Sequence, residues 1–181
     1  MRITKTPFEG LIIVEPKVFG DQRGFFYESY NKKDFHNSGI SMEFVQDNQS
    51  SSKMGVLRGL HFQKPPFAQV KLIRVLFGVI QDVVVDLRQS QPTFGQHYSL
   101  ELSDLNKKQL LVPHGFAHGF LVLSERADVM YKCDSFYRPE AEGGIRHDDA
   151  RLAIAWEIEK EKRIVSDKDL ELSEFSSAFV F

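Results

Sequence analysis

The stretch that decides the fold runs from Val70 to Leu87 and reads VKLIRVLFGVIQDVVVDL. Two runs rich in β-branched residues, Val70–Phe77 and Val79–Leu87, are separated only by Gly78. β-Branched and aromatic residues favour strands, and a glycine between two such runs favours a tight bend. The stretch therefore predicts two strands that are joined by a very short connection.

Similar short runs, bounded by Gly, Pro, Asn and Asp, occur along most of the chain. The further predicted strands are Leu11–Phe19, Phe25–Tyr30, Val56–Gln63, Gln96–Ser103, Phe116–Ser124, Val129–Cys133 and Leu152–Ile158. Many short strands at this spacing indicate a mostly β fold, and specifically a cupin-like jelly-roll β-barrel. We expect a single domain over residues 1–181, because a chain of this length suits one core.

Predicted helices are few and short. Lys32–Asn37 is expected to form one or two helical turns that end near Gly39. Ser166 is expected to cap a last helix that continues through Leu170–Phe175, because an acidic residue, Asp169, follows it three positions later. The barrel should therefore finish in a short C-terminal helical segment.

Composition excludes several functional classes. The formal net charge is −2, and the chain has no basic block, so a general nucleic-acid binder is a poor expectation. No apolar run approaches the roughly 20 residues of a membrane helix, and the N-terminal residues lack the apolar core of a signal peptide. Cys133 is the single cysteine and is expected to be a buried, inert thiol, which fits a reducing, cytoplasmic compartment.

The strand Val79–Leu87 has an uneven pattern on one of its faces. Period-two alternation puts Asp82 and Asp86 on the same side as Ile80 and Val84. Carboxylates that alternate with apolar residues could line a polar barrel mouth. An ordinary solvent-exposed face is the expectation that we favour for Asp82 and Asp86.

The densest polar stretch contains a histidine that is suited to proton transfer. His61 follows Arg58 by three positions, so strict alternation would place the two side chains on opposite faces. If both serve one site, the strand has to bend, and Gly59 is the residue that would allow this. A histidine exchanges protons near neutral pH, and an arginine can hold a phosphate with several donors.

Two residues on later strands could complete such a site. Lys71 shares a face with Ile73 and Val75, so its ammonium group is costly unless it meets an anion such as an enolate oxygen. The alternative is an edge-strand lysine that prevents aggregation. Tyr131 could donate a proton, although a buried structural tyrosine is the commoner case.

The pair His114 and His118 could suggest a metal site. Their spacing of four would bring them together on a helix, but the surrounding glycines and β-type sequence argue against a helix. The chain also has no His-x-His pair, which a metal-binding cupin would be expected to carry. We therefore expect no bound metal.

Taken together, the segments resemble the dTDP-4-dehydrorhamnose 3,5-epimerase family, also called dTDP-6-deoxy-D-xylo-4-hexulose 3,5-epimerases. The resemblance extends from Phe8 to about Leu170 in the order of the family. Its matching segments are Phe19–Ser29, Phe44–Asn48, Leu57–Gln63, Pro113–Phe120, Tyr131-Lys132, Glu142-Gly143 and Ser166–Asp169. It implies a cupin-type homodimer whose N-terminal strands contribute to the dimer, with no cofactor, acting in dTDP-L-rhamnose biosynthesis.

The resemblance also implies roles for individual residues. His61 matches the catalytic base, Asp169 the carboxylate that orients it, Lys71 the lysine that stabilises the enolate, and Tyr131 the proton donor. Asp167 stays open as the alternative orienting carboxylate, because the match is less secure after Trp156. The implied substrate-binding positions are Arg23, Glu28, Gln46, Asp47, Asn48, Arg58, Gln63, His118, Tyr137, Glu142 and Lys168.

The implied reaction explains why these residue types are needed. A ketone at C4 acidifies the C3 and C5 hydrogens, so a base, a cation beside the oxygen and an acid on the opposite face can invert each centre. Three alternatives remain at this point. They are a sister enzyme that inverts one centre, a sugar ketoisomerase, and a non-catalytic module that binds nucleotide sugars.

Overall fold

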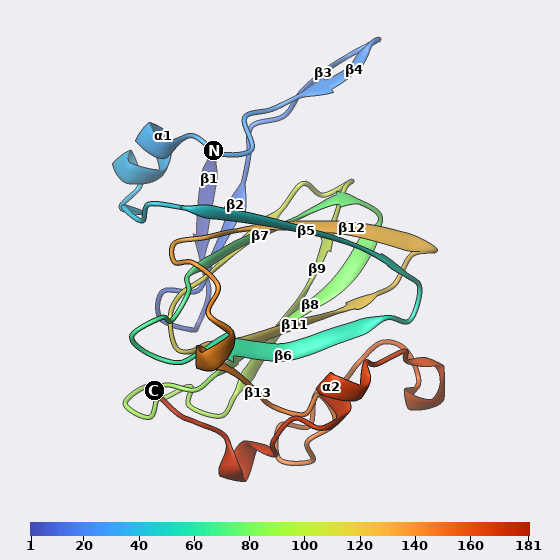
Figure 1. Cartoon of the computed structure of the whole chain (residues 1–181). Coiled ribbons are helices and arrows are strands. Elements are labelled where there is room, and N and C mark those ends of the chain that lie inside the picture. The colour runs from blue at the N-terminus through green and yellow to red at the C-terminus, as the bar shows by residue number, and fades with distance from the viewer.

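The computed structural model describes residues 1–181 and consists mainly of two antiparallel β-sheets packed face to face (Figure 1). The larger sheet has the strand order β1-β2-β10-β7-β12-β5, and the smaller sheet has the order β13-β6-β11-β8-β9. The larger sheet is formed by β1 (Arg2–Lys5), β2 (Ile12–Glu15), β5 (Gln46–Lys53), β7 (Lys71–Phe77), β10 (Gln109–Val112) and β12 (Arg126–Cys133). The smaller sheet is formed by β6 (Leu57–Gln63), β8 (Val79–Asp86), β9 (His97–Ser103), β11 (Phe116–Val122) and β13 (Glu142–Gly144).

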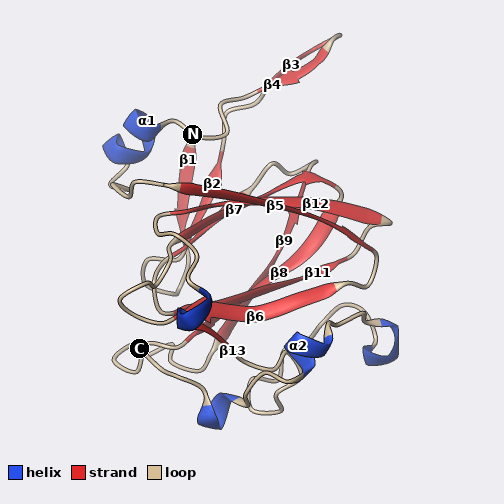
Figure 2. Cartoon of the chain, in the orientation of Figure 1, coloured by secondary structure: helices blue, strands red, loops and turns tan.

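The remaining elements lie outside the two sheets. A separate hairpin projects from the body of the molecule (Figure 1), and the few helices lie at the periphery (Figure 2). These elements are β3 (Phe19–Asp21), β4 (Gly24–Phe26), α1 (Lys32–Asn37), α2 (Asp167–Leu170) and the 3-10 turns Pro139–Ala141, Lys160–Lys162 and Phe175–Ser177. The mostly β, cupin-like jelly-roll fold expected from the sequence is confirmed. None of the helices has the length and apolar character needed to cross a bilayer.

Alternation along β8 determines how the layers pack. Ile80 and Val84 belong to the apolar core between the two sheets. Val83 and Val85 point the other way, into a second apolar cluster that covers the outer face of the smaller sheet. Gly78, with a φ of 82°, carries the chain from β7 in one sheet to β8 in the other.

The C-terminal segment covers the outer face of the smaller sheet, as Figure 1 shows. Leu152 and Trp156 from this segment are buried against Leu57, Leu121 and Ile145. A buried apolar cluster of this kind supplies most of the free energy that holds such a segment in place. It fixes the backbone that leads to α2.

Several expected boundaries are wrong, and each has a physical reason. Leu152–Ile158 is irregular rather than a strand, because its apolar residues cover a sheet from outside without joining its hydrogen-bond ladder. The predicted strand Leu11–Phe19 is limited to β2, and Phe25–Tyr30 contributes only the end of β4. The last helix begins at the predicted Ser166 cap but ends at Leu170. Strands β1, β3, β5, β10 and β13 were not predicted.

Asp82 and Asp86 correct another expectation. Both side chains are fully buried, with 0% of their surface exposed, so they do not form a solvent face. The alternation pattern correctly placed both residues on the same side of β8 as Ile80 and Val84. That side is interior because the larger sheet covers it, which depends on the tertiary fold and not on the local sequence.

The predicted bend in β6 occurs at Gly59. This residue has a φ of 120°, and the pairing of β6 with β11 shifts register between His118 and Phe120. A bulge of this kind changes the phase of side-chain alternation. As a result, Arg58 and His61 both reach the same cavity.

We predict that Gly59→Ala destabilises the fold strongly. A β-carbon at this position would lie 2.6 Å from Gly119 Cα and 2.8 Å from the His118 carbonyl oxygen. The steric overlap and backbone strain together should lower the free energy of unfolding by roughly 2–5 kcal/mol, measured by urea titration. Gly24→Ala is the matched control, because Gly24 has a φ of 127° but nothing within 4 Å of the added atom. Similar losses in the two variants would contradict the steric explanation.

Candidate active site

A cavity of about 270 Å³ lies between the two sheets and collects most of the chemically active side chains. Residues from both sheets and from α2 contribute to its walls. They are Ser50, Arg58, His61, Lys71, His118, Gly119, Phe120, Tyr131, Ser166, Lys168 and Asp169. All four residues expected to be catalytic therefore face one space, together with Arg58, His118 and Lys168 from the expected binding set.

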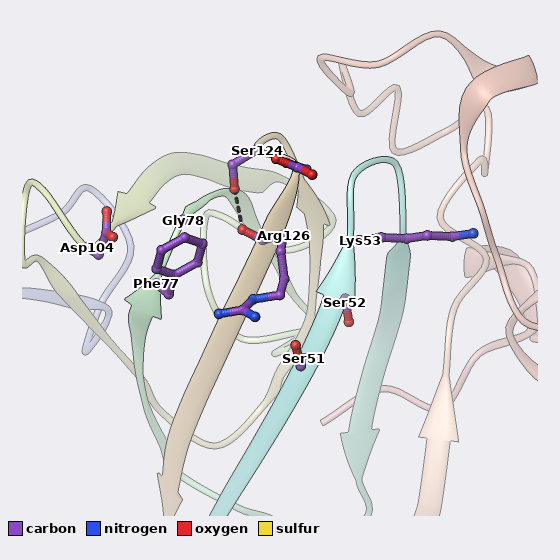
Figure 3. A pocket seen from close by; sticks show the side chains of 9 residues that line it. Ser51, Ser52, Lys53, Phe77, Gly78, Asp104, Ser124 and Arg126 are labelled. Carbon is purple, nitrogen blue, oxygen red and sulfur yellow. Dashed lines mark hydrogen bonds between the residues drawn. The ribbon is translucent and has the colours of Figure 1, made fainter.

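A larger groove of about 550 Å³ lies elsewhere, at the hairpin ends, and none of the predicted residues lines it (Figure 3). There the Ser124 hydroxyl donates to the Arg126 carbonyl over 2.7 Å, and the Arg126 guanidinium stacks 4.7 Å from the centre of the Phe77 ring. Ser124 and Arg126 therefore already have interaction partners within the protein. We therefore assign the chemistry to the smaller cavity.

His61 and Asp169 form a hydrogen-bonded pair at one side of the cavity. Nε2 of His61 lies 2.6 Å from Oδ1 of Asp169, and the Gly59 amide donates to Oδ2 over 3.1 Å. Burial by itself raises the pKa of Asp169, but the hydrogen bonds from His61 and Gly59 outweigh it, so the net pKa lies below the usual value. An ionised Asp169 holds the imidazole in one orientation, as in other His–Asp pairs.

The local structure explains why Asp169 is the orienting carboxylate. The Ser166 hydroxyl caps α2 by accepting the amide hydrogen of Asp169 over 3.2 Å. This cap turns the Asp169 side chain inward, where only 6% of it is exposed. Asp167, the alternative from the sequence, is exposed and accepts no side-chain hydrogen bond, so it does not take this position.

Lys71 lies on the opposite sheet. It begins β7, which has β10 on one side and β12 on the other, so the alternative of an edge-strand lysine is wrong. Its ammonium group forms no salt bridge and lies 5.6 Å from the centre of the Tyr131 ring. Burial lowers the pKa of Lys71, while the carboxylates of Asp82 and Glu142 oppose this effect. A cation without a protein partner is available to a developing oxyanion.

Tyr131 reaches the cavity from β12 of the larger sheet. It pairs across the sheet with Asn48 on β5 and Ile73 on β7. Burial raises the pKa of the Tyr131 phenol, which keeps its proton on the oxygen near neutral pH. Tyr131 and His61 therefore face the cavity from different sheets, with a proton donor on one wall and a proton acceptor on the other.

The single cysteine is a buried thiol, as expected. Cys133 has no exposed surface, and Nδ2 of Asn48 lies 3.7 Å from its sulfur. Burial raises the pKa of Cys133 to about 11. A thiol in this state is a poor nucleophile at neutral pH.

A linked set of polar residues continues from the cavity towards the surface. The carboxylate of Glu142 accepts the Tyr137 hydroxyl and the Lys168 ammonium group, each over 2.7 Å. The Tyr137 amide donates to Gln46 over 2.9 Å, and the Arg138 amide donates to Gln63 over 2.6 Å. Tyr137 is 48% exposed, so its ring is open to a ligand at the entrance.

Comparison with known proteins identifies the family of the chain. The model of the dTDP-4-dehydrorhamnose 3,5-epimerase family matches residues 5–177. The chain belongs to this family. A Shigella flexneri dTDP-4-dehydrorhamnose 3,5-epimerase is 48% identical over 182 residues, which cover 100% of this chain and 99% of that protein.

Two solved structures of epimerases are closely similar. The Elizabethkingia anophelis dTDP-4-dehydrorhamnose 3,5-epimerase has a TM-score of 0.93 and 51% identity, and the match covers 97% of each chain. A Legionella pneumophila 3,5-epimerase, solved in complex with dTDP-4-keto-L-rhamnose, has a TM-score of 0.93 and 47% identity. That match covers 97% of this chain and 93% of the Legionella chain.

Eight of the eleven expected substrate-binding residues do not line the cavity within one chain. Five of them belong to the linked polar set at its entrance, namely Gln46, Asn48, Gln63, Tyr137 and Glu142. The other three lie away from it. Arg23 lies on the projecting hairpin, where its guanidinium is bound by Asp21, and Glu28 is exposed beyond that hairpin. Asp47 pairs with Lys132 over 2.9 Å on the opposite face of the larger sheet from Asn48. The position of Asp47 is set by alternation in β5, which was not predicted as a strand.

Other residues of the site were missed in the sequence. Ser52 orients Arg58 by accepting its Nε hydrogen over 3.1 Å, and Asp82 lies 2.9 Å from Nε2 of His118. His114, in contrast, lies outside the cavity, where it pairs with Asp134. The signal for Asp82 was present, because a carboxylate between Ile80 and Val84 on one strand face indicates an interior charge.

We predict that Asp169 makes the fold sensitive to acid. Its folded-state pKa is lowered, so its ionised form stabilises the fold above the unfolded-state pKa of about 4, and this contribution is lost as the pH falls through the folded-state value. The decline in the free energy of unfolding below about pH 5 should be shallower in Asp169→Asn than in the wild type. Asp167→Asn is the control and should keep the wild-type slope. Equal slopes in all three proteins would refute the assignment.

Proposed function

We propose that this chain inverts both C3 and C5 of a dTDP-4-keto-6-deoxy-hexose, in the formation of dTDP-L-rhamnose. The observation that carries the proposal is the placement of His61 and Tyr131 on different sheets of one cavity, with Lys71 beside them. Inversion requires that a proton leaves one face of the sugar and returns to the other. A base and an acid on facing walls meet this requirement.

In the first step, His61 accepts the proton from the carbon next to the ketone. Asp169 holds Nε2 of the ring, which leaves Nδ1 as the nitrogen that is free to accept a proton from the substrate. The electron pair of the broken C–H bond moves into the ring C–C bond and onto the C4 oxygen. The resulting imidazolium is stabilised by the ionised Asp169.

Lys71 stabilises the enolate oxygen that forms in this step. Its ammonium group has no carboxylate partner to displace, so no existing ion pair has to break. One donor at such an oxyanion typically contributes about 3–4 kcal/mol to the transition state. The lowered pKa of Lys71 reflects the cost of holding this charge in a confined site.

In the second step, Tyr131 donates its phenolic proton to the opposite face of the same carbon. The enolate returns its electron pair to carbon, so the ketone re-forms and the configuration is inverted. Proton exchange with solvent then resets His61 and Tyr131. The carbons are neither oxidised nor reduced overall, so the steps balance without a redox cofactor.

The remaining polar residues are proposed to hold the nucleotide part of the substrate. Arg58 and Lys168 supply donors for the diphosphate along the cavity wall, which His118 also lines. The exposed ring of Tyr137, next to Gln46 and Glu142, is placed to stack on the thymine base. Gln63 and Asn48 are expected to support this entrance.

The protein is also proposed to act as a homodimer in the cytoplasm. Arg23 and Glu28 do not reach the cavity of their own chain, and the projecting hairpin could carry both into the site of a second copy. Cys133 is a free thiol, and a chain with one cysteine forms no internal disulfide, which fits a reducing compartment.

Solvent hydrogen exchange tests the proposed reaction. In deuterated water the 4-keto sugar should gain deuterium at both C3 and C5, as detected by NMR of the product. His61→Asn should lose the exchange while it still binds the nucleotide, because an amide cannot accept the proton. We expect turnover to fall at least about 1,000-fold.

Each alternative reaction has its own outcome in the same assay. Deuterium at one carbon alone would identify a single-centre epimerase, and a ketone found at C3 would identify a ketoisomerase. Tight binding of dTDP-sugars without any exchange by the wild-type protein would instead favour a binding module. Any of these results would replace the proposed double epimerisation.

Mixing two inactive variants tests the dimer. If Arg23 serves the partner's site, a dimer of Arg23→Ala and His61→Asn chains contains one intact site, and random mixing should restore about one quarter of wild-type activity. If Arg23 serves its own chain, mixing restores nothing. Light scattering should give twice the mass of one 20.8 kDa chain. A monomer would refute the proposal.

A further inference from the structure

A second His–Asp pair, distinct from His61 and Asp169, lies inside the molecule. Asp82, in β8, is fully buried between the sheets, and its Oδ2 lies 2.9 Å from Nε2 of His118. Its other oxygen, Oδ1, is buried and has no hydrogen-bond partner. His118 lines the cavity from β11, where it is the cross-strand neighbour of His61.

The hydrogen bonding of Asp82 is incomplete, which is unusual for a buried carboxylate with a structural role. Asp86 lies four positions further on the same face of β8 and is equally buried. It receives hydrogen bonds from the Arg88 guanidinium over 2.7 and 2.8 Å and from the Thr93 hydroxyl over 2.6 Å. A buried carboxylate oxygen without any donor destabilises a fold, so Asp82 is not explained by stability.

The contact with Asp82 determines which ring nitrogen of His118 is free to meet a ligand in the cavity. An ionised carboxylate only accepts hydrogen bonds, so the hydrogen of this contact has to be on Nε2 of His118. Nδ1 then remains as the nitrogen that can meet a ligand, and no protein group bonds to it. The charge of Asp82 also acts across the cavity on Lys71, where it opposes the effect of burial.

We propose that Asp82 is a positioning residue of the active site. It fixes the ring and the tautomer of His118 against the substrate, and it supplies negative charge that balances the cations of the cavity without forming an ion pair with Lys71. The role in turnover rests on the proposed epimerase function. The orientation of His118 does not, so it can be tested separately.

The first measurement follows the His118 ring by nitrogen NMR, with the signal assigned from the spectrum of His118→Gln. In the wild type we expect one ring state, with the hydrogen on Nε2. In Asp82→Asn the amide can either donate or accept, so the ring should populate both tautomers. A wild-type His118 with its neutral-form hydrogen on Nδ1 would overturn the proposal, and this result requires no variant of Asp82 to fold.

The second measurement compares turnover in Asp82→Asn with turnover in Asp86→Asn. We expect Asp82→Asn to keep the wild-type melting temperature but to lose about 10- to 100-fold in kcat/KM, the effect of one hydrogen bond to a charged group. Asp86→Asn should melt earlier, because it weakens the contacts with Arg88 and Thr93, while the folded protein retains wild-type turnover. The same loss in both variants, in proportion to their stability, would show a purely structural role.

A double variant tests whether Asp82 acts through His118. If it does, Asp82→Asn in a His118→Gln background should cause little further loss, whereas independent residues would give multiplied losses. If the wild type is active and Asp82→Asn keeps its turnover within twofold of the wild-type value, the role of Asp82 is refuted. The epimerase function is not affected by that result. Absence of solvent exchange in the wild type would refute the epimerase function. The NMR measurement would still test the orientation of His118 independently.

Discussion

The contact between Asp169 and β6 is the interaction on which the rest of the site depends. One carboxylate binds Nε2 of His61 and the amide of Gly59, so it fixes the proposed base and the bent strand beneath it together. Asp169 reaches β6 because apolar residues such as Leu152 and Trp156 hold the C-terminal segment against the smaller sheet. Apolar packing outside the cavity therefore determines where His61, the proposed proton acceptor, lies.

The two-sheet architecture places this pair across the cavity from the other proposed catalytic residues. His61 belongs to the smaller sheet, while Lys71 and Tyr131 are near neighbours on adjacent strands of the larger one. A proton acceptor and a proton donor on the same strand would act on one face of a flat ring. Placing them on separate layers, with the cation beside the donor, allows removal from one face and return to the other with little movement of the sugar.

The sequence predicted most strands and the residues of the cavity, and its failures share a cause. Period-two alternation assigned the faces of Val79–Leu87, but whether a face meets water depends on the layer that covers it. Gln46–Lys53 was missed because its inward face lines a polar cavity and carries serine and asparagine in place of apolar residues. Leu152–Ile158 was misread because covering a sheet requires apolar side chains but no strand geometry.

The two buried carboxylates of β8 illustrate how a site keeps its cations free. Asp86 faces an arginine that has no other charged partner, and close pairing is the stable arrangement there. Asp82 lies behind His118, next to a cavity in which Lys71 has to remain open to an oxyanion. A direct ion pair would satisfy the buried charge but would occupy the cation, since a lysine held by a carboxylate has to break that contact before it binds substrate. A carboxylate that contacts only His118 supplies the opposing charge while Lys71 stays unpaired, so its incomplete hydrogen bonding is what this chemistry requires.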